Sequence, residues 1–383
     1  MAVTLQGLAT AVPPTVLIQN EVRDVFAAQP GLSRLAQRII QTSFDVSAIE
    51  TRYTTLSELS NTPRTAEDGP PVFFDLATGE LLLPGTKARN EIYAEQATAL
   101  YVEAGRAAID ACPAIDPADV THVVTVSCTG FYAPGPDFMI ARDLGLDPGV
   151  QRYHLGFMGC YAAMPALRLA KQLCEADPAA VVLVVSVELC TLHLRSSNDP
   201  DTIVASSLFA DGAGAGIVTA RPPAPGERAF VLDGFESRTT PVGEGDMAWK
   251  IGDHGFEMVL SNSVPALIDE YITGALEPLF AAEAPLAAAL EAGTAGEAVA
   301  HWAIHPGGRS ILDKVESRLA LGESQLVPSR AVLRDFGNMS SATVLFVLRE
   351  ILRSDAAASG DRVAAMAFGP GLTVESALMT VSG

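Results

Sequence analysis

The sequence has few cysteines, little positive charge and no long hydrophobic run. Its five cysteines are an odd number and form no CxxC pair, so neither a disulfide framework nor a zinc site is indicated. We therefore expect a reducing, cytoplasmic setting and no metal. No stretch of about 18 apolar residues is present, which argues against a membrane span. The N-terminus lacks the basic and apolar regions of a signal peptide, so we expect none.

Acidic residues strongly outnumber basic ones. There are 25 lysines and arginines against 45 aspartates and glutamates, which gives a formal net charge of −20. This balance disfavours nucleic acid and anionic membranes as partners, and an anionic ligand would need local donors. With 383 residues, 49% of them hydrophobic and 18% charged, the chain can form a large globular core or two lobes.

Apolar, β-branched runs alternate with Ala/Leu-rich stretches along the chain. The former are typical of strands inside a sheet, and the latter are typical of helices. We therefore expect an α/β protein with largely parallel, buried strands. The predicted strands lie at residues 123–126, 181–187 and 363–367, and the predicted helices lie at 91–111, 163–175 and 342–353.

A Pro-rich run at residues 221–226 is the clearest linker. It divides the chain into an N-terminal half, residues 1–222, and a C-terminal half, residues 226–383. Each half ends in Gly-rich and apolar strands, at 211–219 and 368–381. The similarity of these two segments is a weak sign of a duplicated α/β fold.

Two other segments differ in composition from the rest. Residues 55–88 are polar and rich in Pro and Gly, which favours an insertion or a surface excursion. Residues 281–300 are rich in Ala and Glu, and we expect surface helices there with a break at glycine.

The segment GFMGC, at residues 156–160, places a cysteine after two glycines and before a helical pattern. The glycines allow a tight turn, and Pro165 suits the first turn of the helix. A thiol held there would lie near a helix N-terminus, where the dipole and free N–H groups favour thiolate and can bind an oxyanion. Cys160 is therefore a candidate nucleophile with a lowered pKa. A buried structural cysteine is the alternative.

A short apolar strand ends in His305, which is followed by Pro306, Gly307 and Gly308. A histidine on a loop at a strand end is well placed as an acid, a base or a hydrogen-bond donor. The glycines allow a ligand to approach the backbone closely. The remaining histidines lack this context, and we expect them to be structural: His122, His154, His193, His254 and His301.

Asn338 follows Gly337 and precedes two serines that open an Ala/Leu-rich stretch. Its type and position suit a helix cap. An amide in an active site would instead donate a hydrogen bond without competing as a base.

Together, these segments resemble the type III polyketide synthases, the chalcone and stilbene synthase family. The order GFxGC, IHPGG, GNMSSA is that of the family, and so is the spacing: His305 lies 145 residues after Cys160, and Asn338 lies 33 residues after His305. The segments at 207–213 (SLFADGA) and 368–375 (FGPGLTVE) are also similar to family motifs. The resemblance covers nearly the whole chain and points to the bacterial branch.

The resemblance implies an α/β, thiolase-like fold of two related αβαβα halves, a homodimer joined at a buried sheet edge, and a site where the halves meet. It implies iterative decarboxylative Claisen condensation of malonyl-CoA onto an acyl-CoA starter, then cyclisation, with no cofactor. Cys160 would carry the acyl group. His305 and Asn338 would donate hydrogen bonds to the enolate oxygen.

The resemblance also implies residues along the substrate path. Phe209 and Met258 match two positions between the CoA tunnel and the cyclisation chamber. The family usually has phenylalanine at both, so the flexible thioether of Met258 would make a softer gate. Gly307, Gly308 and Ser310 would contact the pantetheine arm.

The basic residues that plant members use for the CoA phosphates are not clearly kept. Arg38 and Arg52 are the candidates for that role.

The loop at residues 127–135 matches the family loop at the chamber floor, near the dimer interface. Some bacterial members that accept fatty acyl starters and make alkylpyrones or alkylresorcinols look similar at Thr129, Ala133 and Cys190. Small side chains there would leave an apolar tunnel for an alkyl tail. The alternative is that these residues pack against bulkier neighbours, with His193 closing the space.

Two other functions fit the same residue types. A ketoacyl-ACP synthase III shares the fold and triad, but it usually has HQAN where this chain has HPGG, at 305–308, and it would use malonyl-ACP. A Cys/His thioester hydrolase would use Asn338 to orient the histidine and would release free acid without decarboxylation.

Overall fold

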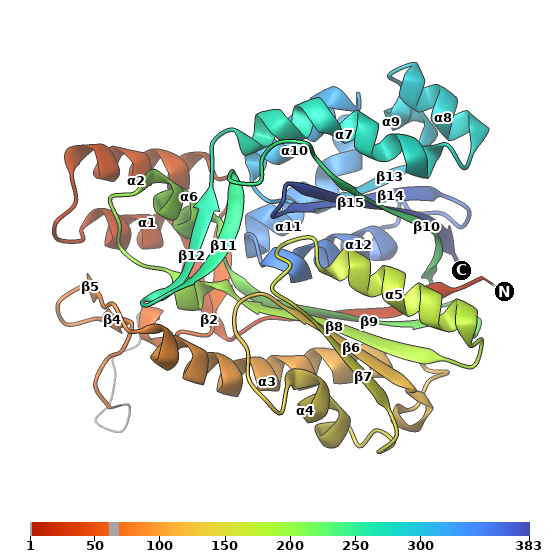
Figure 1. Ribbon diagram of the computed structural model, residues 1–383, viewed down its shortest axis with the longest axis horizontal. Coiled ribbons are helices and arrows are strands. Elements are labelled where there is room, and N and C mark those ends of the chain that lie inside the picture. The colour runs from red at the N-terminus through yellow and green to blue at the C-terminus, as the bar shows by residue number, and fades with distance from the viewer. Residues whose placement is uncertain (1, 61–68) are drawn as a thin grey trace.

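The protein is described by a computed structural model that covers residues 2–60 and 69–383. Its helices and strands stack in alternating layers, with helices outside both sheet layers and between them (Figure 1). One outer layer holds α3 (Thr86–Asp110) and α4 (Pro136–Asp143), the central layer α5 (Ala163–Ala176) and α12 (Thr343–Arg353), and the other outer layer α7 (Val264–Phe280) and α10 (Arg309–Arg318).

The strands of both sheet layers form one hydrogen-bonded sheet in the order β13-β14-β15-β10-β1-β9-β8-β6-β7. A two-pair ladder between β1 and β10 joins the layers. The bounds are β1 Thr4–Ala11, β6 His122–Ser127, β7 Gln151–Gly156, β8 Val181–Leu189, β9 Asp211–Thr219, β10 Ala229–Thr239, β13 His301–Ile304, β14 Arg362–Gly369 and β15 Thr373–Ser382.

The two layers repeat one topology. In β1-β9-β8-β6 the successive pairings are antiparallel, antiparallel and parallel, and β10-β15-β14-β13 has the same series. Strands β9 and β15, which contain the similar segments at the ends of the two halves, occupy the same position in these two series. The predicted duplication is therefore confirmed.

The expected largely parallel sheet is wrong. Among the described strands of this sheet, three neighbouring pairs are parallel and five are antiparallel. Helices cover both faces of β8 and β9, so every residue of these strands is buried. An apolar run of this kind reveals burial but not strand direction. The edge strand β7 differs because it is largely exposed.

The predicted helices are present. The helix expected at 91–111 begins earlier, at Thr86, and the Ala-rich segment forms α8 (Ala284–Glu291) and α9 (Ala295–Ala298) around Gly293, whose φ is +73°. The predicted excursion contains a 3-10 turn (Ser57–Leu59) and the short hairpin β4 (Phe74–Asp75)–β5 (Glu80–Leu81). Its residues 61–68 lie outside the described part. The segment 221–226 connects β9 to β10, and a domain boundary there stays a prediction.

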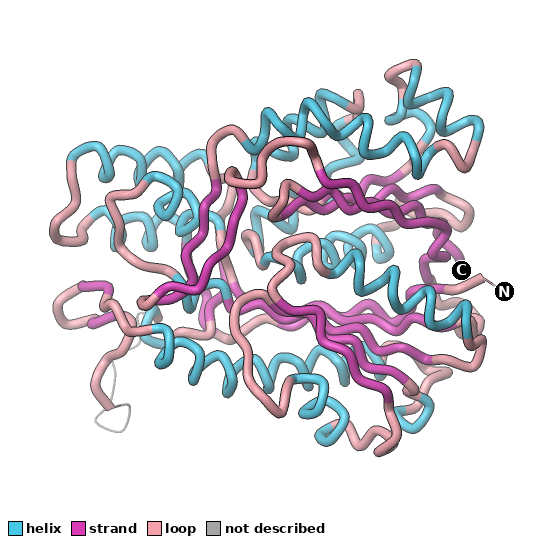
Figure 2. The backbone as a smooth tube through the Cα atoms, in the orientation of Figure 1, coloured by secondary structure: helices cyan, strands magenta, loops and turns pink. Residues whose placement is uncertain are grey.

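The remaining elements gather at one end of the layers, away from the chain termini (Figures 1 and 2). They are β2 (Thr15–Ile18), α1 (Gln19–Ala27), α2 (Arg34–Val46), β3 (Thr51–Thr54), α6 (Pro200–Leu208) and the hairpin β11 (Met247–Gly252)–β12 (Gly255–Leu260), while α11 (Val327–Phe336) leads into α12.

Helix α12 is buried between the two sheet layers. Its residues 343–348 are all buried, which is the pattern of a helix covered on every side. Only a position between two sheets satisfies this pattern, and α12 contacts strands of both layers. Within the described residues, no helix is long and apolar enough to cross a membrane.

Candidate active site

Cys160 lies in the turn between β7 and the central helix α5. Phe157 and Gly159 have left-handed backbones there, with φ of +60° and +85°. A Cβ on Gly159 would lie 2.5 Å from Cδ of Pro370, so both its conformation and its space require glycine. The turn holds the Cys160 side chain in a buried position just before the helix.

His305 and Asn338 come from the C-terminal half. His305 follows β13 directly, and its backbone N–H donates to the Met366 carbonyl at 2.8 Å. Asn338 forms a bridge with Phe209 and precedes the 3-10 turn Ser340–Ala342 that opens α12. Cys160 and Asn338 thus stand before the two central helices, which places the site where the halves meet.

A chain of contacts connects the three side chains. The Ser340 hydroxyl lies 3.3 Å from the Cys128 sulfur, and it lowers the pKa of the neighbouring Cys160 thiol. The Ser340 N–H donates to Oδ1 of Asn338 at 2.9 Å, and Nδ2 of Asn338 donates to the Gly307 carbonyl at 3.2 Å. A Cβ on Gly307 would lie 3.7 Å from Nε2 of His305. The structure therefore brings the predicted triad together.

The imidazole of His305 is 1% exposed, and neither of its ring nitrogens has a hydrogen-bond partner among the described residues. Leaving a buried polar atom unpaired costs about 1–3 kcal/mol. Both nitrogens are therefore available to a substrate or to the thiol.

Burial dominates the ionisation of the site. It raises the pKa of Cys160 to about 12, and the Ser340 hydroxyl offsets part of that shift. Burial lowers the pKa of His305 to about 3. The sequence led us to expect that the helix terminus lowers the thiol pKa and that a His305 imidazolium adds to this effect. In the structure, the desolvation of the thiolate outweighs that contribution, so a stable thiolate needs a positive partner.

Five of the predicted substrate residues lie near Cys160 or His305. Cys190 and Phe209 pack in one cluster with Cys160, and Met258 packs against it. Gly307 follows His305, and Gly308 opens α10. The small pocket beside this cluster, about 20 Å³, is lined by Cys190, His193, Leu194, Arg195, Thr202, Ala205, Ser206, Phe209, Trp249, Phe256 and Met258. We call it the site pocket.

Thr129 and Ala133 are not brought into the site pocket. The Thr129 hydroxyl donates to Glu188 at 2.8 Å, and the Thr129 carbonyl bonds to Nε2 of His193 at 2.8 Å. The His193 ring stacks on Phe256, with centroids 4.2 Å apart. Ala133 is exposed. His193 thus lies between Thr129 and Phe256 on this side, whereas Ala133 is not packed against bulkier neighbours as the alternative interpretation expected.

Arg52 is not a phosphate contact. Its side chain is fully buried and donates to the backbone carbonyls of Ser206 and Phe209, at 2.9 and 2.6 Å. It supports the end of α6 and cannot reach a ligand. Arg38 on α2 and Ser310 are exposed. Their contacts with the CoA phosphates and the pantetheine arm stay predictions.

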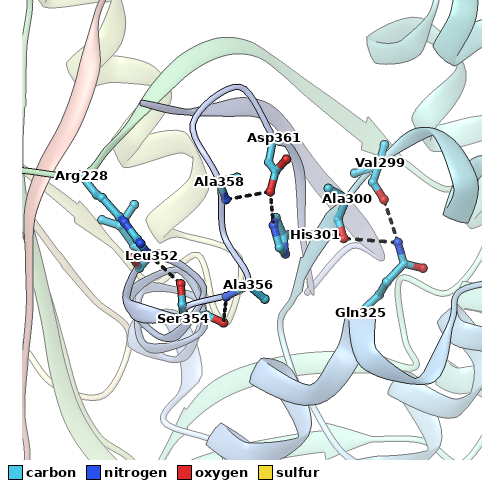
Figure 3. A network of polar contacts seen from close by, with 10 residues as sticks. All are labelled: Arg228, Val299, Ala300, His301, Gln325, Leu352, Ser354, Ala356, Ala358 and Asp361. Atoms are coloured by element: carbon cyan, nitrogen blue, oxygen red, sulfur yellow. Dashed lines mark hydrogen bonds and ion pairs between the residues drawn. The ribbon is translucent and has the colours of Figure 1, made fainter. Parts of the chain in front are cut away.

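His301 is structural, as expected. Its Nε2 lies 2.9 Å from Oδ2 of Asp361, and that oxygen also accepts the N–H of Ala358 at 2.9 Å (Figure 3). The contact ties the start of β13 to the turn before β14. His122 and His154 bond to neighbouring threonine hydroxyls.

Sequence reasoning missed Glu188. This carboxylate is fully buried at the end of β8, and burial raises its pKa. It accepts hydrogen bonds from the Thr129 hydroxyl, the Cys128 N–H at 3.0 Å and the Ser341 hydroxyl. It therefore ties the loop after β6 to the turn that carries Asn338. The only signal was one acidic residue inside an apolar strand.

Comparisons with known proteins agree with this architecture. Profiles described as "Chalcone and stilbene synthases, N-terminal domain" and "C-terminal domain" match residues 2–222 and 235–382. The chain is 33% identical to Type III polyketide synthase 10 of Oryza sativa subsp. japonica over 98% of this chain and 91% of that protein. It is 36% identical to bisdemethoxycurcumin synthase of the same organism, over 77% of this chain and 74% of that protein.

Among solved structures, the crystal structure of PKS-I from the brown alga Ectocarpus siliculosus matches with a TM-score of 0.87 and 26% identity, over 99% of this chain and 98% of that one. The fold is thus the α/β thiolase-like fold of type III polyketide synthases. The chain belongs to the chalcone and stilbene synthase family, and it is a type III polyketide synthase, an acyltransferase with condensing activity. These predictions are confirmed. A place in the bacterial branch stays a prediction.

Proposed function

We propose that Cys160, His305 and Asn338 catalyse the repeated decarboxylative condensation of malonyl-CoA onto an acyl-CoA starter. The observation that carries this proposal is the unpaired, buried imidazole of His305 next to an amide whose donor end points toward the same loop. An oxyanion site needs two such donors in a place without water.

Loading of the starter begins with the thiol. Transfer of its proton to His305 forms a thiolate–imidazolium pair, in which the opposite charges stabilise each other against the burial that disfavours each charge alone. The thiolate attacks the thioester carbonyl of the starter. Coenzyme A then leaves as its thiol, with the proton from His305, and the acyl group remains on Cys160.

Extension begins when malonyl-CoA loses carbon dioxide. The electrons of the broken bond move to the thioester oxygen as an enolate, which His305 and Asn338 stabilise by donating hydrogen bonds. Removing one such donor raises the activation barrier by about 3 kcal/mol. The enolate carbon then attacks the acyl carbonyl, expels the Cys160 thiolate and lengthens the chain by one ketide unit.

We further propose an aliphatic starter and products of the alkylpyrone or alkylresorcinol type. In support, the side chains that contact Cys160 are apolar and mostly small: Cys190, Ala205 and Phe209, with Met258 behind them. A flexible thioether adapts to chains of different shape.

A homodimer is part of the proposal. The edge strand β7 leaves its side chains largely exposed, and Tyr153 and the nearby Phe131, Phe138 and Phe157 are exposed aromatics. Such an edge pairs readily with another strand. Light scattering should show twice the chain mass of 40.1 kDa, whereas a monomer at assay concentrations would contradict the proposal. A cytoplasmic location stays a prediction.

A product assay tests the function directly. The enzyme is incubated with malonyl-CoA and a panel of aliphatic and aromatic acyl-CoA starters, and the products are identified by mass spectrometry, with Cys160→Ala as the control. Cyclised polyketides from aliphatic starters are expected. Dependence on malonyl-ACP would favour a ketoacyl-ACP synthase III activity, and free acid without carbon dioxide release would favour a hydrolase.

A further inference from the structure

We propose that an apolar cavity beside α1 binds the distal part of a long acyl chain held on Cys160. This inference rests on the proposed function and identifies the substrate class as long-chain aliphatic acyl groups. The α1 cavity, about 210 Å³, lies among residues of α1, β2, the 3-10 turn at Ser57 and the β4–β5 hairpin. It is lined by Val16, Leu17, Ile18, Glu21, Val22, Val25, Phe26, Leu56, Leu59, Phe73, Phe74, Leu76, Gly79, Leu81, Thr191 and Leu194.

The lining of the α1 cavity suits a hydrocarbon. Val22, Val25 and Phe26 share one face of α1, and most of the other lining residues are leucine or phenylalanine. Two of the lining residues, Val16 and Leu76, keep 46% and 38% of their surface exposed, and a bound alkyl chain would bury part of this apolar surface. A dry cavity of about 150 Å³ already accepts a benzene-sized ligand, so this one is large enough for several methylenes.

The α1 cavity and the site pocket are separate spaces that meet at the segment of the 3-10 helix Cys190–His193 and Leu194, and the proposal requires the Leu194 side chain to move aside. Cys190 lines the site pocket, Thr191 lines the α1 cavity, and Leu194 lines both. At about 2 Å of rise per residue, Cys190 and Leu194 are about 8 Å apart. Roughly six carbon–carbon bonds of about 1.5 Å cover that distance. Leu194 is therefore the only side chain that both spaces share among the described residues.

The other direction is closed. On one wall of the site pocket, the rings of His193, Trp249 and Phe256 pack edge to face and face to face, with centroids 4.2 to 5.8 Å apart. Hydrogen bonds hold two of them: Trp249 donates to the Cys128 carbonyl at 2.7 Å, and His193 uses both ring nitrogens. The site pocket itself, about 20 Å³, is too small for a long chain. A leucine side chain rotates more easily than this aromatic wall.

The chain-length dependence should reflect this layout. A short starter ends before Leu194 and gains nothing from the α1 cavity. Once the chain passes Leu194, each buried methylene should raise kcat/KM about fourfold until the cavity is full.

Photo-crosslinking tests where the tail lies. The enzyme is loaded with a 16-carbon acyl-CoA that carries a diazirine at its ω end, and the acylated Cys160 is verified by peptide mass. After irradiation, the label is expected on residues that line the α1 cavity, such as Val22, Val25 or Phe73. A label on residues 127–135 would overturn the proposal while leaving the chemistry of Cys160 intact. Absence of acylation at Cys160 would overturn the proposed function and this inference together.

Matched variants give a second measure. Val25→Phe fills the α1 cavity, and Val242→Phe makes the same change at a valine that is 48% exposed and lines neither space. Val25→Phe should lower kcat/KM for a 16-carbon starter at least tenfold and leave a 4-carbon starter within twofold. Val242→Phe should change neither. Equal losses for both starters in Val25→Phe, or no loss at all, would contradict the proposal.

Discussion

The backbone of Ser340 orients the side chain of Asn338: the Ser340 N–H donates to Oδ1 of Asn338 at 2.9 Å. A backbone N–H only donates, so the amide must turn its carbonyl end toward Ser340. Its Nδ2 donates to the Gly307 carbonyl at 3.2 Å, on the loop that begins with His305. The donor end of Asn338 is therefore held against the loop that follows His305.

For Asn338→Asp, this orientation predicts that the fold is retained and that decarboxylation is lost. Aspartate keeps the oxygen that accepts from Ser340 but removes the donor, so the fold should be retained. Decarboxylation of malonyl-CoA should fall by about 10²-fold or more, because one oxyanion donor is lost. Mass spectrometry of the acetyl-CoA formed measures the rate, with thermal unfolding as the control. A rate near that of the wild type would show that Asn338 does not stabilise the enolate.

Substitutions at the other two triad positions should separate the half-reactions. Cys160→Ala removes the acyl carrier but leaves both donors, so it should make no polyketide and still decarboxylate malonyl-CoA. His305→Ala should lose both reactions, since the imidazole serves the thiolate and the enolate. Product and acetyl-CoA are measured in the same sample. If Cys160→Ala also loses decarboxylation, the division of roles between thiol and donors is wrong.

The reactivity of Cys160 toward iodoacetamide should depend on His305. Burial alone raises the pKa of Cys160 to about 12, so without a cation the thiolate forms only at strongly alkaline pH. With the His305 imidazolium beside it, the alkylation rate should level off below about pH 8.5, the value for a free thiol. In His305→Ala, the rate should still be rising at pH 10. The labelled peptide is identified by mass spectrometry.

Two results would contradict this dependence. One is an identical pH profile in wild type and His305→Ala. The other is preferential labelling of Cys128 or Cys190 at neutral pH while activity is intact.

His193 should make the fold sensitive to acid. Burial lowers the pKa of His193 from 6.5 to about 3. Below pH 6.5 the unfolded chain therefore binds a proton that the folded chain excludes. The stability contributed by the neutral ring is complete above pH 6.5 and is lost as the pH falls toward 3. Between pH 7 and 5 this linkage amounts to about 2 kcal/mol.

The measurement is urea unfolding at pH 7 and pH 5. His193→Gln should reduce the acid-induced loss of unfolding free energy by about 2 kcal/mol, whatever its own effect on stability at pH 7. His254→Gln, at an exposed histidine, is the matched control and should behave as the wild type does. Equal acid losses in all three proteins would show that His193 is not the group responsible.

Much of the fold could be predicted because its signals are local. The central helix α5 begins at Ala163, where the apolar pattern after Cys160 predicted it. The strand β8 is the apolar run beginning at Val181. Strand direction could not be predicted, because helices cover both faces of β8 and β9 and both directions then need the same apolar residues.

The residues of the candidate site also fall into two groups: those with a local sequence signal and those whose role depends on distant contacts. The three chemical groups could be identified from the sequence, since Cys160, His305 and Asn338 each stand in a short motif whose glycines and flanking residues act over a few positions. Three other features became visible only in the folded chain: Arg52 supports α6 instead of a phosphate, Glu188 ties two loops together, and the cavity next to Leu194 lies beside α1. These features depend on burial and on contacts between segments far apart in the chain, and desolvation, unlike local propensity, cannot be read from neighbouring residues.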